Sequence, residues 1–177
     1  IIPTLVPRLG VYAYSFLDNR VPGVQPYEEA GYWRDVGTIA AYWQANMDLL
    51  GAAPRLNLDN PQWPILTSAF PGPSARVIEG QVDDVLIGEG SRIEGAVVRH
   101  SIIGRGVRVE SGATIDESLV MDHTIVRAGA RIRRAVVDRY NIIEHGIQIG
   151  YDPDEDARRY TLDPSGIVVL ARGTTRF

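Results

Sequence analysis

The feature that most constrains the fold is a repeat of about six residues between Arg76 and Gly150. Each repeat has two aliphatic residues, two variable residues, a glycine, and then a small or apolar residue. The clearest copies are LIGEGS, IIGRGV, IVRAGA and IIEHGI, which begin at Leu86, Ile102, Ile125 and Ile142. A helix repeats every 3.6 residues and an amphipathic strand every two, and neither places glycine on this schedule. The period predicts a solenoid of short strands, with aliphatic side chains inside and glycines at the corners.

Three steps of the repeat make one coil of a triangular solenoid, so residues three steps apart should stack in columns. The three predicted columns are Ile87, Ile103, Val120 and Val137; Ile93, Val109, Val126 and Ile143; and Val98, Ile115, Ile132 and Ile149. Four members in each column predict four coils without an inserted loop. The stretch GIVVLARG, residues 166–173, follows as a closing strand.

The residues before the repeat have a different organisation. Thr38 is a good cap for a helix over residues 39–50, and Gly51 is suited to end it. Small and aromatic residues alternate over residues 11–16, a pattern that favours a strand. Residues 52–75 are rich in proline and read as a connector. The sequence therefore predicts three parts: residues 1–51, a linker over 52–75, and the solenoid over 76–177.

Composition excludes several classes of function. The formal net charge of −4 argues against nucleic acid and anionic membranes as partners, because both require a basic surface. The absence of cysteine excludes disulfides and thiolate metal sites, and fits a reducing, cytoplasmic location. All eighteen basic residues are arginine, so any phosphate held by a charged side chain would meet a planar guanidinium.

Several motifs together carry a family resemblance. In order along the chain, they are YWRDVGT, a helix with YW that ends in MDLL, NPQWPI, the hexapeptide repeats, GYDPDEDARRY and GIVVLARG. This series resembles bacterial glucose-1-phosphate adenylyltransferases over essentially the whole chain. In that family a Rossmann-like α/β nucleotidyltransferase domain precedes a left-handed parallel β-helix. The resemblance implies a mainly β chain, in which such a β-helix follows the last strands and helix of the catalytic domain.

The resemblance also implies a function. The family makes ADP-glucose and pyrophosphate from ATP and glucose 1-phosphate, with Mg²⁺, for glycogen biosynthesis, usually as a homotetramer controlled by phosphorylated metabolites. This chain has no glycine-rich nucleotide loop and no lysine to meet the sugar phosphate. We therefore expect a C-terminal fragment that is inactive alone, with ATP and glucose 1-phosphate bound mainly by the missing N-terminal half.

Asp35, in YWRDVGT, is the candidate catalytic residue. By resemblance it would ligate Mg²⁺ together with an aspartate from the absent half. Mg²⁺ commonly takes one or two carboxylates and completes its coordination with water and phosphate oxygens, so one aspartate is chemically sensible. The alternative is structural: Asp35 would cap the turn before the helix or pair with Arg34.

Three arginines, Arg139, Arg172 and Arg176, resemble positions of the family's effector site. Converging guanidinium groups would hold a phosphorylated effector. For Arg139 the repeat offers another interpretation, because charged residues of alternating sign recur at one offset from the aliphatic columns. The two resulting ladders are Glu89, Arg105, Asp122 and Arg139, and Asp83, Arg99, Asp116 and Arg133. Such exposed ion pairs contribute about 0 to 1 kcal/mol each.

Two further functions compete with the leading one. The chain could be a stand-alone assembly module, or a hexapeptide acyltransferase with its site between subunits. A zinc site would need three converging imidazoles, and His100, His123 and His145 fall in three different columns of the repeat. The identity of the effector and the quaternary arrangement stay open.

Overall fold

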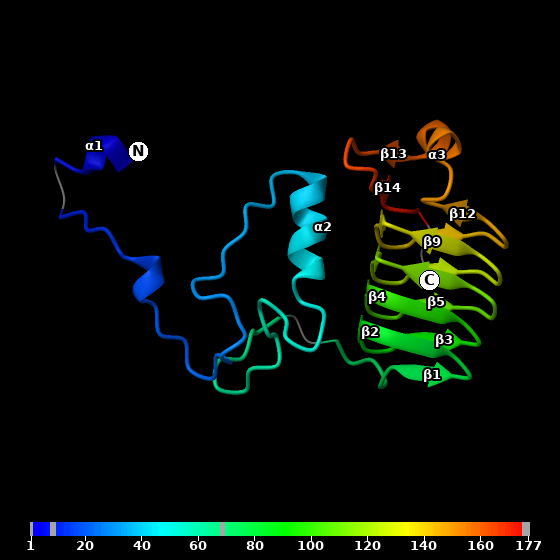
Figure 1. Cartoon of the computed structure of the whole chain (residues 1–177), viewed down its shortest axis with the longest axis horizontal. Helices are drawn as coiled ribbons and strands as arrows, with labels where there is room; N and C mark the ends of the chain where they lie inside the picture. The colour runs from blue at the N-terminus through cyan, green and yellow to red at the C-terminus, as the bar shows by residue number, and fades with distance from the viewer. Residues whose placement is uncertain (1, 8–9, 68–69, 175–177) are drawn as a thin grey trace.

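The computed structural model describes residues 2–7, 10–67 and 70–174. Short strands form a solenoid in which each coil lies on the one before it (Figure 1). Helix α2, Ile39–Met47, lies beside this solenoid, while the residues that precede α2 extend away from it (Figure 1). The predicted parallel β-helix is therefore confirmed as the body of the chain.

Parallel strands build the three faces of the solenoid. One sheet has the order β1 (Arg76–Ile78), β3 (Arg92–Glu94), β5 (Arg108–Val109), β8 (Ile125–Val126) and β11 (Ile142–Ile143). The other contains β12 (Gln148–Ile149), β9 (Arg131–Arg133), β6 (Thr114–Asp116), β4 (Val97–Ile103), β7 (Leu119–Val120), β10 (Ala135–Val137) and β14 (Val168–Leu170), with β2 (Gln81–Ile87) paired to β4. Strand β13 (Thr161–Leu162) joins the end of this sheet and is antiparallel to β14. Strand β4 is long enough to turn a corner, so the second sheet covers two faces.

The observed register confirms all three predicted aliphatic columns. For example, Val98 pairs with Ile115, which pairs with Ile132 on the next coil. Nearly every member of the columns is buried, and Ile87 in the first coil is the partly buried exception. Burial of these aliphatic side chains supplies the main stabilisation of the solenoid.

The corners only partly follow the predicted use of glycine. One corner has left-handed glycines in successive coils, at Gly95, Gly112, Gly129 and Gly146. Another begins with Gly90 and Gly106 but continues with His123 and Tyr140, whose φ angles are 57° and 64°. The third is made of Asp84, His100, Glu117 and Arg134, all with positive φ. The prediction of glycine was wrong for this third corner. There the hydrogen-bonded strands on either side hold non-glycine residues in a conformation they rarely adopt.

Helix α2 packs on the face formed by β4, β7 and β10. The Thr38 hydroxyl accepts a hydrogen bond from the Ala41 amide at 3.1 Å, which confirms the predicted cap, and the helix ends at Met47, earlier than expected. Met47 and Leu50 are buried against the face residues Leu119, Val136 and Ile167. Tyr42, also on α2, is exposed.

Polar contacts at the third corner add to this packing. The Trp43 indole N–H donates to the Glu117 carbonyl at 3.0 Å, and the Gly51 amide donates to the Asp84 carboxylate at 2.6 Å. The same carboxylate contacts His100 Nδ1 at 2.6 Å. Hydrogen bonds therefore fix the middle of the helix, and the residues just after its C-terminus, to the solenoid.

The strand expected over residues 11–16 does not form. Residues 11–15 have no regular structure and are followed by a short 3₁₀ turn η1, Phe16–Asp18; the helix α1, Ile2–Leu5, precedes them. The side chain of Tyr12 is 90% exposed. A strand needs a neighbour to receive its backbone hydrogen bonds, and among the described residues this segment has none.

The polar segment after Gly150 contains a short helix. Helix α3, Pro153–Arg159, begins with Asp152, whose carboxylate accepts from the amides of Asp154 and Glu155. Strands β13 and β14 follow, and β14 adds to β10 as the predicted closing strand. None of the helices in the described part of the chain is long and apolar enough to cross a membrane.

Candidate functional site

Asp35 lies in the exposed loop just before α2. Its Oδ1 accepts a hydrogen bond from the Gly37 amide at 3.0 Å, so the turn expected as a structural role does form. The other oxygen has no hydrogen bond among the described residues. Arg34, the other partner considered, points elsewhere and pairs with different carboxylates.

Arg34 is the centre of a network that anchors this loop. Its Nη1 and Nη2 donate to the two carboxylate oxygens of Glu29 at 2.8 and 2.6 Å. Its Nε donates to Asp48 at 2.9 Å, at the end of α2. Asp48 is only 7% exposed and also accepts from Gln44 Nε2 at 3.1 Å. Bidentate arginine–carboxylate pairing fixes both distance and orientation, so the residue next to Asp35 is held firmly.

The pKa values around Arg34 reflect this pairing. The Arg34 hydrogen bond is the main cause that lowers the pKa of Glu29 to about 2, and Glu29 in turn raises the pKa of Arg34. Burial raises the pKa of Tyr32, and the charge of Asp48 adds to this effect. Glu29 and Arg34 are therefore both charged at neutral pH.

Asp35 can serve only as part of a metal site. Within the described ranges, no group of three or more histidine, aspartate or glutamate side chains is arranged to hold an ion. Mg²⁺ needs only one or two protein carboxylates when phosphate oxygens and water fill the other positions. One exposed carboxylate on an anchored loop fits such a half-site.

Two of the three predicted effector arginines lie at one corner of the solenoid. The Gly173 amide donates to the Arg139 carbonyl at 3.0 Å, so the chain after β14 passes directly beside Arg139. A Cβ on Gly173 would lie 2.1 Å from the Tyr140 carbonyl oxygen, which shows how close this approach is. Arg172 is thereby brought next to Arg139. Arg176 lies outside the described residues.

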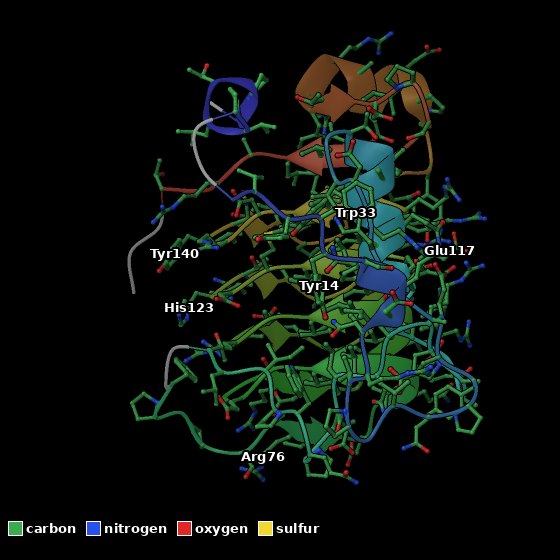
Figure 2. The ribbon with its side chains drawn as sticks, turned by 90° about the vertical axis from the view of Figure 1, so that its left-hand side faces the viewer. Tyr14, Trp33, Arg76, Glu117, His123 and Tyr140 are labelled. Atoms are coloured by element: carbon green, nitrogen blue, oxygen red, sulfur yellow. The ribbon has the colours of Figure 1, made fainter. Side chains whose placement is uncertain are left out.

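Aromatic side chains line the same corner. The rings of His123 and Tyr140 stack with centroids 5.3 Å apart, and the Arg172 guanidinium lies 4.9 Å from the Tyr140 centroid. The Phe70 centroid lies 6.1 Å from that of His123, and the Arg105 guanidinium carbon lies 5.6 Å from the Phe70 centroid. Figure 2 shows His123 and Tyr140 at one edge of the solenoid, with Glu117 at the opposite edge. We call the corner that carries Arg139, Arg172, His123, Tyr140, Phe70 and Arg105 the Arg139 corner.

The charge ladders form as columns but not as ion pairs. Asp83, Arg99, Asp116 and Arg133 occupy successive registered positions. Among the described residues none of them forms a salt bridge with its column neighbour. Arg139 contacts Asp138 at 3.6 Å, and the Asp122 carboxylate accepts from the Arg105 amide at 2.8 Å. The ladder interpretation of Arg139 is therefore wrong as a description of its contacts.

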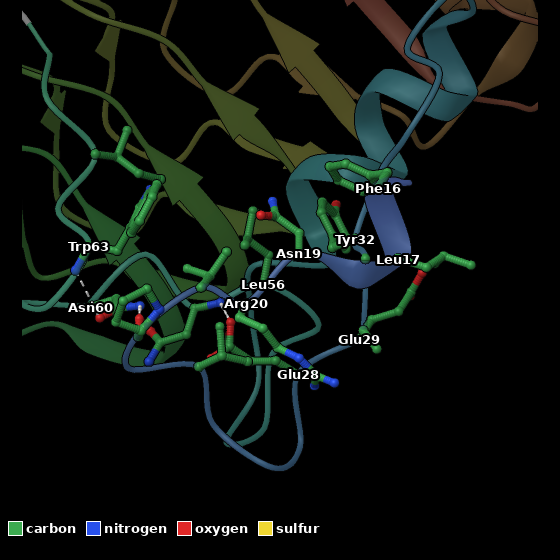
Figure 3. Close-up of a pocket in the computed structure, with 17 residues that line it drawn as sticks. Phe16, Leu17, Asn19, Arg20, Glu28, Glu29, Tyr32, Leu56, Asn60 and Trp63 are labelled. Carbon is green, nitrogen blue, oxygen red and sulfur yellow. Dashed lines mark hydrogen bonds between the residues drawn. The ribbon is translucent and has the colours of Figure 1, made fainter. Parts of the chain in front are cut away.

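A hollow of about 580 Å³ lies between residues 16–32 and residues 56–65. Figure 3 shows Tyr32, Phe16 and Leu17 at one side of it, and Trp63 at the other. The Trp63 amide donates to Asn60 Oδ1 at 3.2 Å, while the indole itself is 56% exposed. Asp35 does not line this hollow, so it is separate from the candidate metal ligand.

Comparisons with known proteins agree with these features. Glucose-1-phosphate adenylyltransferases from Thermodesulfovibrio yellowstonii and Cutibacterium acnes are 40% and 41% identical to the chain over 97% and 99% of its length. The relative of the same name from Geobacter metallireducens is 41% identical. These matches confirm the resemblance expected from the motifs.

The chain spans only 42–43% of the length of these curated relatives. A family model described as "GlmU-like, C-terminal hexapeptide" matches residues 73–170, which are the solenoid and its closing strand. The repeat, the registered columns and this match lead to one conclusion. The chain belongs to the GlmU-like, C-terminal hexapeptide family.

Proposed function

We propose that the chain works as the C-terminal part of a glucose-1-phosphate adenylyltransferase. This enzyme would form ADP-glucose and pyrophosphate from ATP and glucose 1-phosphate, for glycogen biosynthesis. The observation that carries the proposal is the identity of about 40% to relatives of that name along nearly the whole chain, including the Asp35 loop. A location in the cytoplasm fits the lack of cysteine.

The reaction is a nucleotidyl transfer. A phosphate oxygen of glucose 1-phosphate attacks the α-phosphorus of ATP; a new P–O bond forms while the bond to pyrophosphate breaks. A Mg²⁺ ion would neutralise charge on the α-phosphate and the leaving group. Asp35 would hold this ion, and its hydrogen bond from Gly37 orients one carboxylate oxygen while the other stays available.

The Arg34 network would keep Asp35 in place during turnover. Glu29 and Asp48, from two different segments, accept hydrogen bonds from Arg34. The loop therefore cannot rotate without breaking several charged hydrogen bonds. Misplacing a catalytic group by about 1 Å can cost about a hundredfold in rate. We therefore assign Arg34 a positioning role, through the loop, and no contact with substrate.

Exposed apolar side chains support the idea that more protein surrounds the Asp35 loop. Tyr12, Leu17 and Trp33 are 90%, 77% and 67% exposed, respectively. Such a concentration of apolar surface in one segment is typical of a face that packs against further protein. In this proposal the part of the enzyme that precedes the chain covers these residues and binds most of ATP and glucose 1-phosphate.

The solenoid would carry regulation and assembly. Arg139 and Arg172 lie together at the Arg139 corner, and Arg176 follows four residues after Arg172 in the sequence. Converging guanidinium groups would suit a phosphorylated metabolite effector. We propose that subunits associate as a homotetramer, with neither nucleic acid nor a membrane as partner.

The test is pyrophosphate release by the full-length enzyme that includes this chain. With ATP, glucose 1-phosphate and Mg²⁺, we expect release that requires all three components and yields ADP-glucose. UTP, GTP and dTTP should support markedly less product. Absence of ADP-glucose formation, or acyl transfer from an acyl-CoA instead, would contradict the proposal.

A further inference from the structure

A second hollow, of about 340 Å³, lies on the solenoid face made by β4, β6 and β9. It shares no residue with the Asp35 loop or the Arg139 corner. Its polar lining consists of Arg99, Thr114, Asp116, Arg131, Arg133 and Tyr151. This set of six residues is called the Arg131 hollow below.

The repeat itself brings these side chains together. Residues two apart on a strand point to the same side, so Arg131 and Arg133 face outward while Ile132 is buried between them. On the neighbouring strand Thr114 is in register with Arg131, and Asp116 with Arg133. Adjacent strands lie about 4.8 Å apart, so a ligand of a few ångströms can reach both strands at once.

The three arginines of the Arg131 hollow have no ion pair or side-chain hydrogen bond with any described residue. Asp116 stands in register between Arg99 and Arg133 and forms a salt bridge with neither of them. Arg131 is held by the Tyr151 ring, with its guanidinium carbon 4.3 Å from the ring centroid. Three positive charges and one negative charge leave the hollow with a net charge of +2 (3 − 1).

A buried hydroxyl gives a second, independent indication of a ligand. Thr114 Oγ1 is buried, and in the described part of the chain it has no hydrogen-bond partner. Leaving a buried polar group without a partner costs about 1 to 3 kcal/mol. No other buried side-chain nitrogen or oxygen of the described residues is left in this state. A ligand that accepts a hydrogen bond in the Arg131 hollow would remove this cost.

We propose that the Arg131 hollow binds a phosphate-type oxyanion, separately from nucleotidyl transfer. The guanidinium groups and the Thr114 hydroxyl supply several donors, which suits a tetrahedral anion with several acceptor oxygens. An ionised carboxylate can only accept, so Asp116 favours an anion that carries a proton. The site therefore selects hydrogen phosphate, or a protonated phosphoryl group of a metabolite, over sulfate.

The experiment is calorimetric titration of the 177-residue chain with inorganic phosphate, glycerol 3-phosphate and sulfate, at one ionic strength. We expect phosphate or glycerol 3-phosphate to bind more tightly than sulfate. The tighter of the two identifies the source of the ligand as free phosphate or a phosphoryl group. Equal binding of all three anions, or no binding of phosphate and its ester, would overturn the proposal.

Three variants test whether phosphate binds in the Arg131 hollow. The double variant Arg131→Gln and Arg133→Gln should weaken phosphate binding by about tenfold or more. The exposed Arg158, which pairs with Glu155 on α3, is the matched control, and Arg158→Gln should bind phosphate as the unaltered chain does. Asp116→Asn should reduce the preference for phosphate over sulfate. Undiminished affinity in the double variant, or an unchanged preference in Asp116→Asn, would contradict the assignment.

Thr114→Val tests the same site independently, in case the double variant fails to fold. Valine has nearly the same shape and lacks the unpaired hydroxyl, so without ligand the chain should be at least as stable as before. Its phosphate affinity should nevertheless fall. If Thr114→Val binds phosphate as tightly as the unaltered chain, the hydroxyl is not part of a binding site and the proposal fails.

Discussion

At the scale of single residues, the candidate site depends on a division of roles between neighbours. Arg34 is committed to Glu29 and Asp48, whereas Asp35 is exposed and keeps one carboxylate oxygen without a described partner. An arginine beside an aspartate usually suggests that the two pair. Here the network turns the guanidinium away, so Asp35 has no cationic partner among the described residues.

The first prediction concerns Asp35 itself. In the full-length enzyme, Asp35→Asn should lower the Mg²⁺-dependent turnover by about a hundredfold or more, because an amide is a much poorer ligand for a hard cation. Initial rates over a range of Mg²⁺ concentrations measure this. Asp154→Asn, an exposed aspartate on α3, is the control and should retain full activity. Wild-type rates in Asp35→Asn would remove Asp35 from the mechanism.

The second prediction is a pH dependence that arises at Glu29. Its pKa is lowered from 4.5 to about 2 by Arg34, so the folded state holds fewer protons than the unfolded state in this range. The stabilisation is therefore complete above about pH 4.5 and is lost as the pH falls toward 2.

Chemical denaturation at several pH values, for the unaltered chain and Glu29→Gln, isolates this contribution. Glu29→Gln should be less stable near neutral pH, and the difference between the two should shrink as the pH falls. A difference that stays constant from neutral pH to pH 3 would show that the Glu29 charge does not contribute.

At the scale of elements, the sequence was most informative where a pattern recurs. The columns of aliphatic residues, the cap at Thr38 and the closing strand β14 were all predicted, because each depends on local spacing or local chemistry. The helix α3 was missed, although Asp152, Pro153 and the acidic first turn form a recognisable start. The strand over residues 11–16 was wrongly predicted because its alternation says nothing about whether a partner strand exists.

The third prediction tests how α2 is fixed to the solenoid. Trp43→Phe removes the donor to the Glu117 carbonyl and should lower the free energy of unfolding by about 1 to 2 kcal/mol. Trp63 offers a matched control, since its indole is exposed, and Trp63→Phe should change stability by less than about 0.5 kcal/mol. Equal effects in the two variants would mean that the Trp43 hydrogen bond does not stabilise the contact.

The fourth prediction concerns the close approach at Gly173. A Cβ there would overlap the Tyr140 carbonyl, so Gly173→Ala must shift the segment that carries Arg172, at a cost of about 1 to 3 kcal/mol. Gly146→Ala is the comparison: nothing lies within 4 Å of its added Cβ, and only its positive φ opposes the change. Thermal unfolding should show the larger loss for Gly173→Ala. A smaller loss there would contradict the close contact described at the Arg139 corner.

At the scale of the whole molecule, periodicity predicted the solenoid but not its lateral contacts. The partners of Arg34 lie five and fourteen residues away in the sequence. Their contact with Arg34 depends on the path of the intervening loops, so no rule of residue spacing could have predicted Glu29 or Asp48 as its partners. The meeting of Arg139 with Arg172 was expected only by resemblance, and the path of the chain after β14 explains it. The charge ladders were inferred from the register of the repeat alone. This inference was correct for the columns and wrong for the ion pairs.

The central claim is that this chain supplies a metal ligand and a regulatory solenoid to a longer nucleotidyltransferase. The most direct measurement is pyrophosphorolysis of ADP-glucose with Mg²⁺ and pyrophosphate, by the 177-residue chain and the full-length enzyme in parallel. We predict ATP and glucose 1-phosphate from the full-length enzyme and no product from the chain alone. Product from the purified chain alone, or none from the full-length enzyme, would contradict this account.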